Sequence, residues 1–119
     1  MANVAFTTVY ESKVVTATAA DASADVVYTV PALHDAQITL IMASNGAATH
    51  TVNIQVYHAD TATYSHLLRS HNIAGGDSYN ILGSSKLFLH AGDKILAYKS
   101  AGTLDVSVSG KQFYNQART

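Results

Sequence analysis

Charged residues are scarce in this chain. Only 13% of its 119 residues are Asp, Glu, Lys or Arg, whereas about 25% is usual for a soluble domain. Disorder combines high net charge with low hydrophobicity, and a coiled coil needs many Glu and Lys residues beside its apolar seam. With 48% hydrophobic residues and a net charge of −1, the chain fits neither class. The near-neutral balance also gives no electrostatic reason to expect a nucleic acid or a membrane as partner.

Cysteine and tryptophan are absent, and proline occurs once. The absence of Cys excludes disulfides, thiolate metal ligands and Cys nucleophiles. The longest apolar run, Leu40 to Ala43, is far shorter than the ~20 residues that span a bilayer. The first residues lack a basic segment followed by a long apolar one, so we expect no signal peptide.

Catalytic motifs are also missing. The six His residues show no H-x-H or H-E-x-x-H spacing, and the single Glu, Glu11, has no His beside it. The sequence contains no G-x-S-x-G, P-loop or G-x-G-x-x-G motif, the patterns that would indicate a Ser nucleophile or a phosphate site. We therefore expect a protein that is not an enzyme, with no catalytic residue, cofactor or metal site. The six His residues that lack the spacing of a metal site are His34, His50, His58, His66, His71 and His90.

Period-two alternation dominates what is present. Val52, Ile54 and Val56 alternate with polar residues, and the segment from Leu104 to Val108 does the same, as expected for half-buried strands. Residues 61–71 fit both helical and strand spacing, and the all-β context favours a strand. The expected strands are 4–9, 13–19, 25–30, 36–44, 49–58, 63–73, 78–82, 86–89, 93–99 and 103–113, the first two being candidates for one bent strand.

Many short strands separated by Gly-containing turns indicate an all-β protein. The predicted fold is a single-domain β-sandwich or barrel with eight to nine short antiparallel strands. Asn45-Gly46 predicts a tight hairpin between the strands near 36–44 and 49–58. Ala-Gly-Asp recurs at Ala74 to Asp77, with one Gly inserted, and at Ala91 to Asp93. Both are predicted hairpins, with Gly in the left-handed conformation and Asp bonding the following amides.

The few charges are unevenly distributed along the chain. Residues 1–60 hold five acids and one base, and residues 61–119 hold three acids and six bases. If the two halves form different faces, identical copies would attract each other head to tail. The seven Tyr residues, against three Phe, are a second hint of contact surfaces, since Tyr buries area while keeping a polar tip. Tyr faces also leave sugar binding open as an alternative.

From Val26 to Phe113 the chain resembles small β-sandwich structural proteins of tailed bacteriophages, above all capsid decoration (cement) proteins. The resemblance lies in a strand ending in V-x-Y-x-V-P-A, an alternating strand ending in V-Y, two A-G-D turns and a closing strand ending in S-G. The matching segments are Val26 to Ala32, Ile54 to Tyr57, Ala74 to Asp77, Leu87 to Asp93 and Val106 to Gly110. The resemblance implies that the fold is an all-β, single-domain β-sandwich, jelly-roll-like. It also implies a virion protein on the capsid exterior, made in the host cytoplasm, with the phage major capsid protein and its own copies as partners, a trimer being expected.

The expected layout has three parts: residues 1–24 as an N-terminal strand or arm, 25–113 as the β-sandwich core and 114–119 as a C-terminal tail. The N-terminal part either adds to a neighbour's sheet or is simply the first strand. The expected contact residues are Val4, Phe6, Val9, Tyr10, Phe113, Tyr114 and Arg118. The alternatives are a tail, neck or fibre-anchor component of the virion, and a carbohydrate-binding adhesion module.

Overall fold

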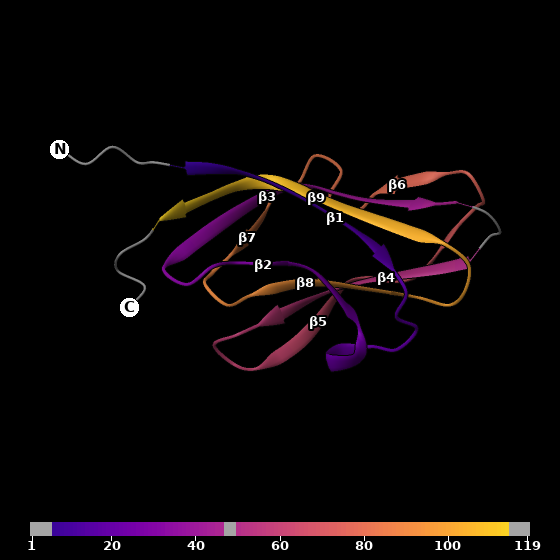
Figure 1. Cartoon of the computed structure of the whole chain (residues 1–119), viewed down its shortest axis with the longest axis horizontal. Coiled ribbons are helices and arrows are strands. Elements are labelled where there is room, and N and C mark those ends of the chain that lie inside the picture. Colours follow the sequence, from indigo (N-terminus) through magenta and orange to yellow (C-terminus); the bar gives the residue numbers. More distant parts are fainter. Residues whose placement is uncertain (1–5, 47–49, 115–119) are drawn as a thin grey trace.

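Two antiparallel β-sheets face each other in the computed structural model, which describes residues 6–46 and 50–114 (Figure 1). The five-stranded sheet contains, in spatial order, β1 (Phe6–Val15), β9 (Leu104–Tyr114), β3 (His34–Asn45) and β6 (Ser78–Asn80), with β7 (Leu87–Leu89) also pairing with β3. The four-stranded sheet contains β2 (Asp25–Thr29), β8 (Lys94–Lys99), β4 (His50–His58) and β5 (Thr63–Ile73). A short 3₁₀ turn, η1 (Asp21–Ser23), precedes β2.

The connections make this sandwich a jelly roll. The chain passes from one sheet to the other after β1, β2, β3, β5, β7 and β8, and β6 and β7 together fill one edge position beside β3. Among the described strands, β4 and β5 are the one consecutive pair that are neighbours in a sheet. Repeated crossing of this kind is how a jelly roll wraps two four-position sheets around one core. The all-β, jelly-roll-like prediction is confirmed.

The core lies between the sheets and follows the predicted alternation. Leu104, Val106 and Val108 on β9 are fully buried, and Val52 and Ile54 on β4 face them from the other sheet. Apolar side chains at every second position pack at the density of an organic crystal, and this burial is the main stabilising term of the fold. Residues 63–73 form a strand, as the all-β context favoured.

The expected hairpin at Asn45-Gly46 is wrong. β3 and β4 belong to different sheets, so this segment is a corner between layers and not a turn within one. The Asn45 side chain is buried and donates a hydrogen bond to the carbonyl of Ile73, 2.7 Å away, while the Gly46 amide donates to Thr103. The Asn-Gly pair signals a change of direction, but the partner of the preceding strand is set by the core.

Both Ala-Gly-Asp turns are also corners between sheets and not hairpins. Gly76 and Gly92 have φ angles of 83° and 86°, so the predicted left-handed glycines are confirmed. The first turn links β5 to β6, and the second links β7 to β8. Asp93 accepts a hydrogen bond from an amide that precedes it in the sequence, contrary to the expected bonding of the following amides.

Gly110 lies very close to the β3 backbone in the five-stranded sheet. A Cβ atom at this position would lie 2.2 Å from the carbonyl oxygen of Gln37. The approach occurs where the β3–β9 register shifts between Ile38 and Leu40. The S-G ending of the closing strand therefore has a structural reason, which is that only Gly fits beside the β3 backbone.

Residues 6–15 form an integral strand of the sandwich. β1 pairs with β9 over its whole length, from Phe6 opposite Phe113 to Val15 opposite Leu104, and Val9 and Val15 belong to the core. Of the two alternatives for the N-terminal part, a strand or an arm, residues 6–15 form a strand. The first and last described strands lie side by side, so Phe6 and Tyr114 share one end of the molecule (Figure 1).

The two halves of the sequence do not form different faces. Each sheet contains strands from both halves, with β1 and β3 beside β9 in one and β2 and β4 beside β8 in the other. The head-to-tail attraction expected from the uneven charge therefore has no basis in this arrangement.

Candidate functional site: an aromatic end

Strand pairing brings together residues that lie almost a whole chain apart. Phe6 on β1 is directly opposite Phe113 on β9, with ring centroids 6.1 Å apart. The Lys111 ammonium lies 4.6 Å from the centroid of the Phe6 ring, within the range of a cation–π contact. Tyr114, which follows Phe113 in β9, makes an edge contact with the ring of His34, and the two ring centroids are 5.6 Å apart. We call this end of the sandwich the aromatic end.

Phe88, which is not among the contact residues expected from the sequence, adds a further ring to the aromatic end. It is 68% exposed, compared with 52% for Phe6 and 56% for Tyr114. Its neighbours Leu87 and Leu89 turn towards the core. A strand that alternates Leu-Phe-Leu must point its Phe the other way. This signal is present in the sequence, where the same three residues otherwise resemble a short apolar run.

A pocket of about 320 Å³ opens at the aromatic end. The β7, β3 and β9 strands contribute Phe88, Leu89, Ala36, Phe113 and Tyr114 to its lining, with the polar residues Asp35 and His90. An apolar pocket with a few polar groups is the usual form of a small binding site. The volume suits one inserted side chain of a partner better than a large ligand.

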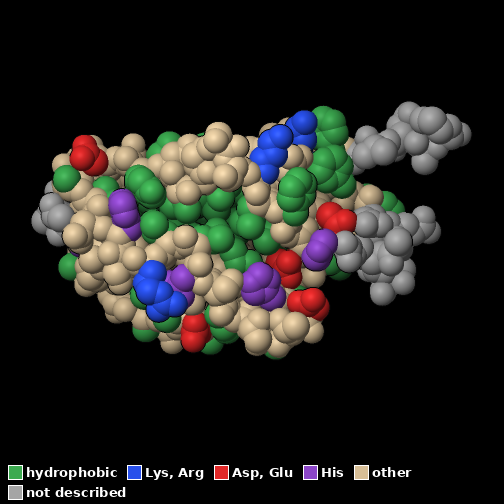
Figure 2. Space-filling model, turned by 180° about the vertical axis from the view of Figure 1, so that it is seen from behind, with side chains coloured by type: hydrophobic (Ala, Val, Ile, Leu, Met, Phe, Trp, Pro, Cys, Tyr) green, Lys and Arg blue, Asp and Glu red, His purple; other side chains and the backbone are tan. Residues whose placement is uncertain are grey.

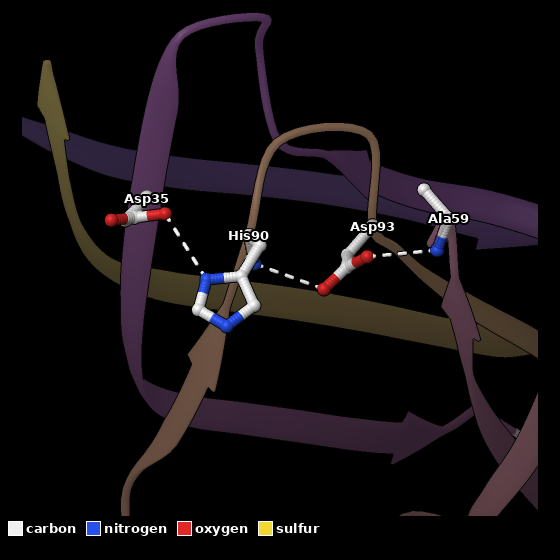
Figure 3. Close-up of polar contacts among 4 residues, drawn as sticks. All are labelled: Asp35, Ala59, His90 and Asp93. Atoms are coloured by element: carbon white, nitrogen blue, oxygen red, sulfur yellow. Dashed lines mark hydrogen bonds and ion pairs between the residues drawn. The ribbon is translucent and has the colours of Figure 1, made fainter. Parts of the chain in front are cut away.

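The polar rim of this pocket is a hydrogen-bonded pair. The carboxylate of Asp35 lies 3.1 Å from Nδ1 of His90, which donates to it, and the two side chains point towards each other from β3 and from the end of β7 (Figure 3). His90 is exposed, and Asp35 is half-buried. The pair forms the polar edge of the pocket.

Asp93 holds the loop that carries His90. Its buried carboxylate accepts one hydrogen bond from the His90 amide and a second from the Ala59 amide, each 2.9 Å long (Figure 3). Two charge-assisted bonds from backbone amides fasten the β7–β8 corner to the β4–β5 loop. The sheet-crossing turn is thereby fixed where it borders the pocket.

The other residues expected to make contacts lie outside the aromatic end or outside the described residues. Val9 is 5% exposed and packs in the core, so its side chain contributes nothing to an outer surface. Tyr10 is 66% exposed but lies four residues along β1 from Phe6, on the outer face of the sheet. Val4 and Arg118 lie outside the described residues.

The outer face of the five-stranded sheet continues from the aromatic end. Its middle carries hydroxyl and apolar side chains in cross-strand register, Ser12 opposite Ser107 and Ser107 opposite Met42. The charged residues that alternate onto this face lie towards its two ends, and they are Asp35, Lys111 and Asp105. The middle of this face therefore carries little charge.

Several side chains on the outer face of the four-stranded sheet form hydrogen bonds with one another. Arg69 donates to Nδ1 of His66 at 2.9 Å, and Nε2 of His66 lies 2.8 Å from the Tyr98 hydroxyl. Desolvation and the Arg69 charge lower the pKa of His66, as expected for a ring nitrogen that accepts a bond from a guanidinium. Tyr57 and Tyr64 pack against each other with centroids 4.9 Å apart.

The side between the two sheet edges is apolar in part. Figure 2 shows a band of hydrophobic side chains running between the two layers on the side opposite to that seen in Figure 1. The half-buried residues packed against the core are Leu68, Ile81, Leu82 and Leu87.

Within 6–46 and 50–114, no three His, Cys, Asp or Glu side chains are grouped as a metal site would need. The same residues contain no helix long and apolar enough to cross a membrane.

Comparison with known proteins adds no relative. No family model, curated protein or solved structure matches this chain.

Proposed function

We propose that this protein is a structural component of a tailed-bacteriophage virion, a capsid decoration protein that oligomerises and binds the major capsid protein on the outside of the shell. The aromatic end carries the proposal. It joins the exposed rings of Phe6, Phe88 and Tyr114 to an apolar pocket, next to a sheet face with little charge. Exposed rings that converge around a pocket are typical of protein-binding surfaces.

The chemistry of this surface suits permanent attachment. Hydroxyl and apolar side chains lose little hydration energy when a partner covers them, whereas buried charges cost several kcal/mol each unless they are paired. In this proposal a side chain of the capsid protein enters the pocket, and the Asp35–His90 pair hydrogen-bonds at its rim. The buried area then stabilises the shell without any chemical step.

The test is binding to expanded capsids that lack the protein. The purified protein should co-sediment with such capsids and raise their resistance to heat. Phe88→Ser and Tyr114→Ser should each weaken binding by about 30-fold, because aromatic anchors at the centre of an interface contribute about 2 kcal/mol or more. Leu67→Ser, which changes an exposed apolar residue of the other sheet, is the matched control and should bind normally. Absence of binding by the wild-type protein would refute the proposal.

A tail, neck or fibre-anchor component is the nearest alternative within the virion. The same aromatic end would then contact a tail or portal protein. Copy number separates the two roles, because decoration proteins cover the whole shell and tail components occupy one symmetry axis. Imaging of intact particles at subunit resolution measures it directly.

A carbohydrate-binding module is a second candidate, and one observation favours it. Tyr57 and Tyr64 form an aromatic pair on the four-stranded sheet, with the Lys94 ammonium 5.4 Å from the Tyr57 ring. Aromatic faces beside polar groups can stack on sugar rings. Glycan-array binding that disappears in Tyr64→Ala would support this role, and an array without binding would exclude it for the glycans present.

A further inference from the structure

The free edge of β1 has a sequence that complements itself. β1 forms one edge of the five-stranded sheet, so the backbone groups on its far side from β9 are available to another strand. Its residues from Tyr10 to Val14 are all exposed. Glu11 and Lys13 stand two positions apart, and neither has an ion-pair partner among the described residues.

We propose that two copies of this chain pair through β1, antiparallel, about a two-fold axis that passes beside Ser12. In this arrangement Glu11 of each copy lies opposite Lys13 of the other, so two ion pairs form. Tyr10 and Val14, which are 66% and 62% exposed, meet across the same axis on the outer face. Directly opposed antiparallel residues are close enough for both kinds of contact.

Charge selects this register from the alternatives. An axis beside Glu11 would place the two Glu11 carboxylates opposite each other, and an axis beside Lys13 would do the same with two ammonium groups. An axis beside Tyr10 would leave Glu11 opposite Val9. Pairing about Ser12 is the register that satisfies both charges. In the joined sheet, the cores of both copies lie on the same side. Shifting one β1 strand by a single residue relative to the other would break this arrangement, because side chains alternate between the two faces of a sheet.

The direction of the two charged side chains fits this geometry. Glu11 and Lys13 have the same parity as the core residues Val9 and Val15, so they leave β1 on the side of β2. Consistent with this, the Glu11 charge contributes to raising the pKa of Tyr28, and the Lys13 charge contributes to lowering the pKa of Asp25. Both of these residues are in β2. In the joined sheet the two β2 strands approach from either side, and the Glu11–Lys13 pairs lie between them.

This pairing closes at two copies, since it is isologous, and it predicts a dimer where the sequence analysis suggested a trimer. It also leaves both aromatic ends free. The two Phe6 residues would lie about 40 Å apart at opposite ends of the joined strands, counting ~3.4 Å per residue. The inference stands on the β1 edge and does not depend on the virion role. If both hold, the dimer is a two-ended clamp that links neighbouring capsid subunits.

Charge exchange tests the register in the whole chain. The wild type should sediment as a species of twice the 12.6 kDa chain mass. Glu11→Lys and Lys13→Glu should each weaken dimerisation at least tenfold, and the double exchange should recover most of it. Asp60→Lys, an exposed loop residue, changes the net charge as Glu11→Lys does and should leave the dimer intact. Far-UV circular dichroism checks that every variant is folded.

Cysteine cross-linking tests the axis, because the natural chain has no Cys. Ser12→Cys places two thiols opposite each other at the axis and should form an intermolecular disulfide under mild oxidation. Thr8→Cys, on the same face of the same strand, should not, since its two copies would be about 27 Å apart at ~3.4 Å per residue.

Three outcomes would overturn the inference. A wild type that stays monomeric would mean that Glu11 and Lys13 protect the edge from pairing, a known use of inward-pointing charges. A trimer, or a dimer that is insensitive to the exchanges and gives no cross-link in the Ser12→Cys variant, would place the contact on another surface. None of these experiments uses capsids, so their failure is distinct from failure of the decoration role.

Discussion

The two outer faces of this sandwich use their side chains in opposite ways. On the four-stranded sheet, side chains bond to one another, as in the chain from Arg69 through His66 to Tyr98. On the five-stranded sheet and at the aromatic end, rings such as Phe88 and Tyr10 project outwards, and the middle is rich in hydroxyls. The first face buries or bonds much of its polar surface, while the second exposes aromatic rings to solvent. Substitutions on the two faces should therefore differ in what they damage.

The largest effect should come from a backbone contact in the five-stranded sheet. Gly110→Ala would place a Cβ atom 2.2 Å from the Gln37 carbonyl oxygen, so β3 and β9 would have to separate. We expect a loss of about 3 kcal/mol in the free energy of unfolding, at the upper end for overpacked sites. Urea denaturation measures it. A loss below about 0.5 kcal/mol would show that the strands are not held this closely.

A smaller but clear loss is expected on the four-stranded sheet. Asn53 is buried, and its side-chain oxygen accepts a hydrogen bond from the Ser70 amide, 2.7 Å away, where β5 bulges. Asn53→Ala leaves that amide without its partner and should cost about 1–3 kcal/mol. Thr51→Ala, on the same face of β4 and half-buried, is the control. Equal stability of the two variants would contradict the assignment.

A pH-dependent effect is expected at the junction between the sheets. Burial alone would raise the pKa of Asp25, but bonds from the Ala17 and Thr16 amides, with the nearby Lys13 charge, outweigh it and lower that pKa below 3.8. A depressed folded-state pKa contributes stability above the unfolded value, and this is lost as the pH falls through the folded value. Asp25→Asn should therefore lower the melting temperature at about pH 7 and have little effect at about pH 2.

The comparison at pH values on both sides of 3.8 needs only thermal unfolding of the wild type and this variant. A difference in melting temperature that is the same at all pH values would show that the Asp25 charge does not matter.

The smallest effect on stability is expected at the aromatic end. Phe88→Ser should change the free energy of unfolding by less than about 0.5 kcal/mol, because the ring is exposed. The same variant is expected to weaken capsid binding by about 30-fold. If it unfolds the protein, then Phe88 belongs to the fold and the contrast between the two faces fails at this residue.

Local patterns predicted the strands well because alternation and turn residues act over a few positions. The alternation in 104–108 could be read directly. The segment 63–73 needed the all-β context, because part of it also fits helical spacing, and the jelly-roll character came from the resemblance. Which strands pair could not be read, because pairing depends on residues far apart. Asn45-Gly46 therefore looked like a hairpin, although the Asn45 side chain bonds to Ile73 at a corner between sheets.

The candidate site was predicted in part. Three of the expected contact residues lie near the two ends of the sequence: Phe6, Phe113 and Tyr114. The register of β1 with β9 brings them together at one end of the sandwich. Val9 was misplaced because the alternation of β1 is weak, with Glu11 and Lys13 at core-facing positions. The Asp35–His90 pair could not be predicted, since it joins residues 55 positions apart.

The position of β9 has a consequence for the order of folding. This strand, the last described, lies between β1 and β3, so β1 has no sheet to join until residues 104–114 have left the ribosome. Strand pairing at such long sequence separation also places a protein among the slow-folding all-β domains. The β1 edge can therefore form only after residues 104–114 are available for pairing. If the proposed β1 dimer forms, its assembly has to follow that step.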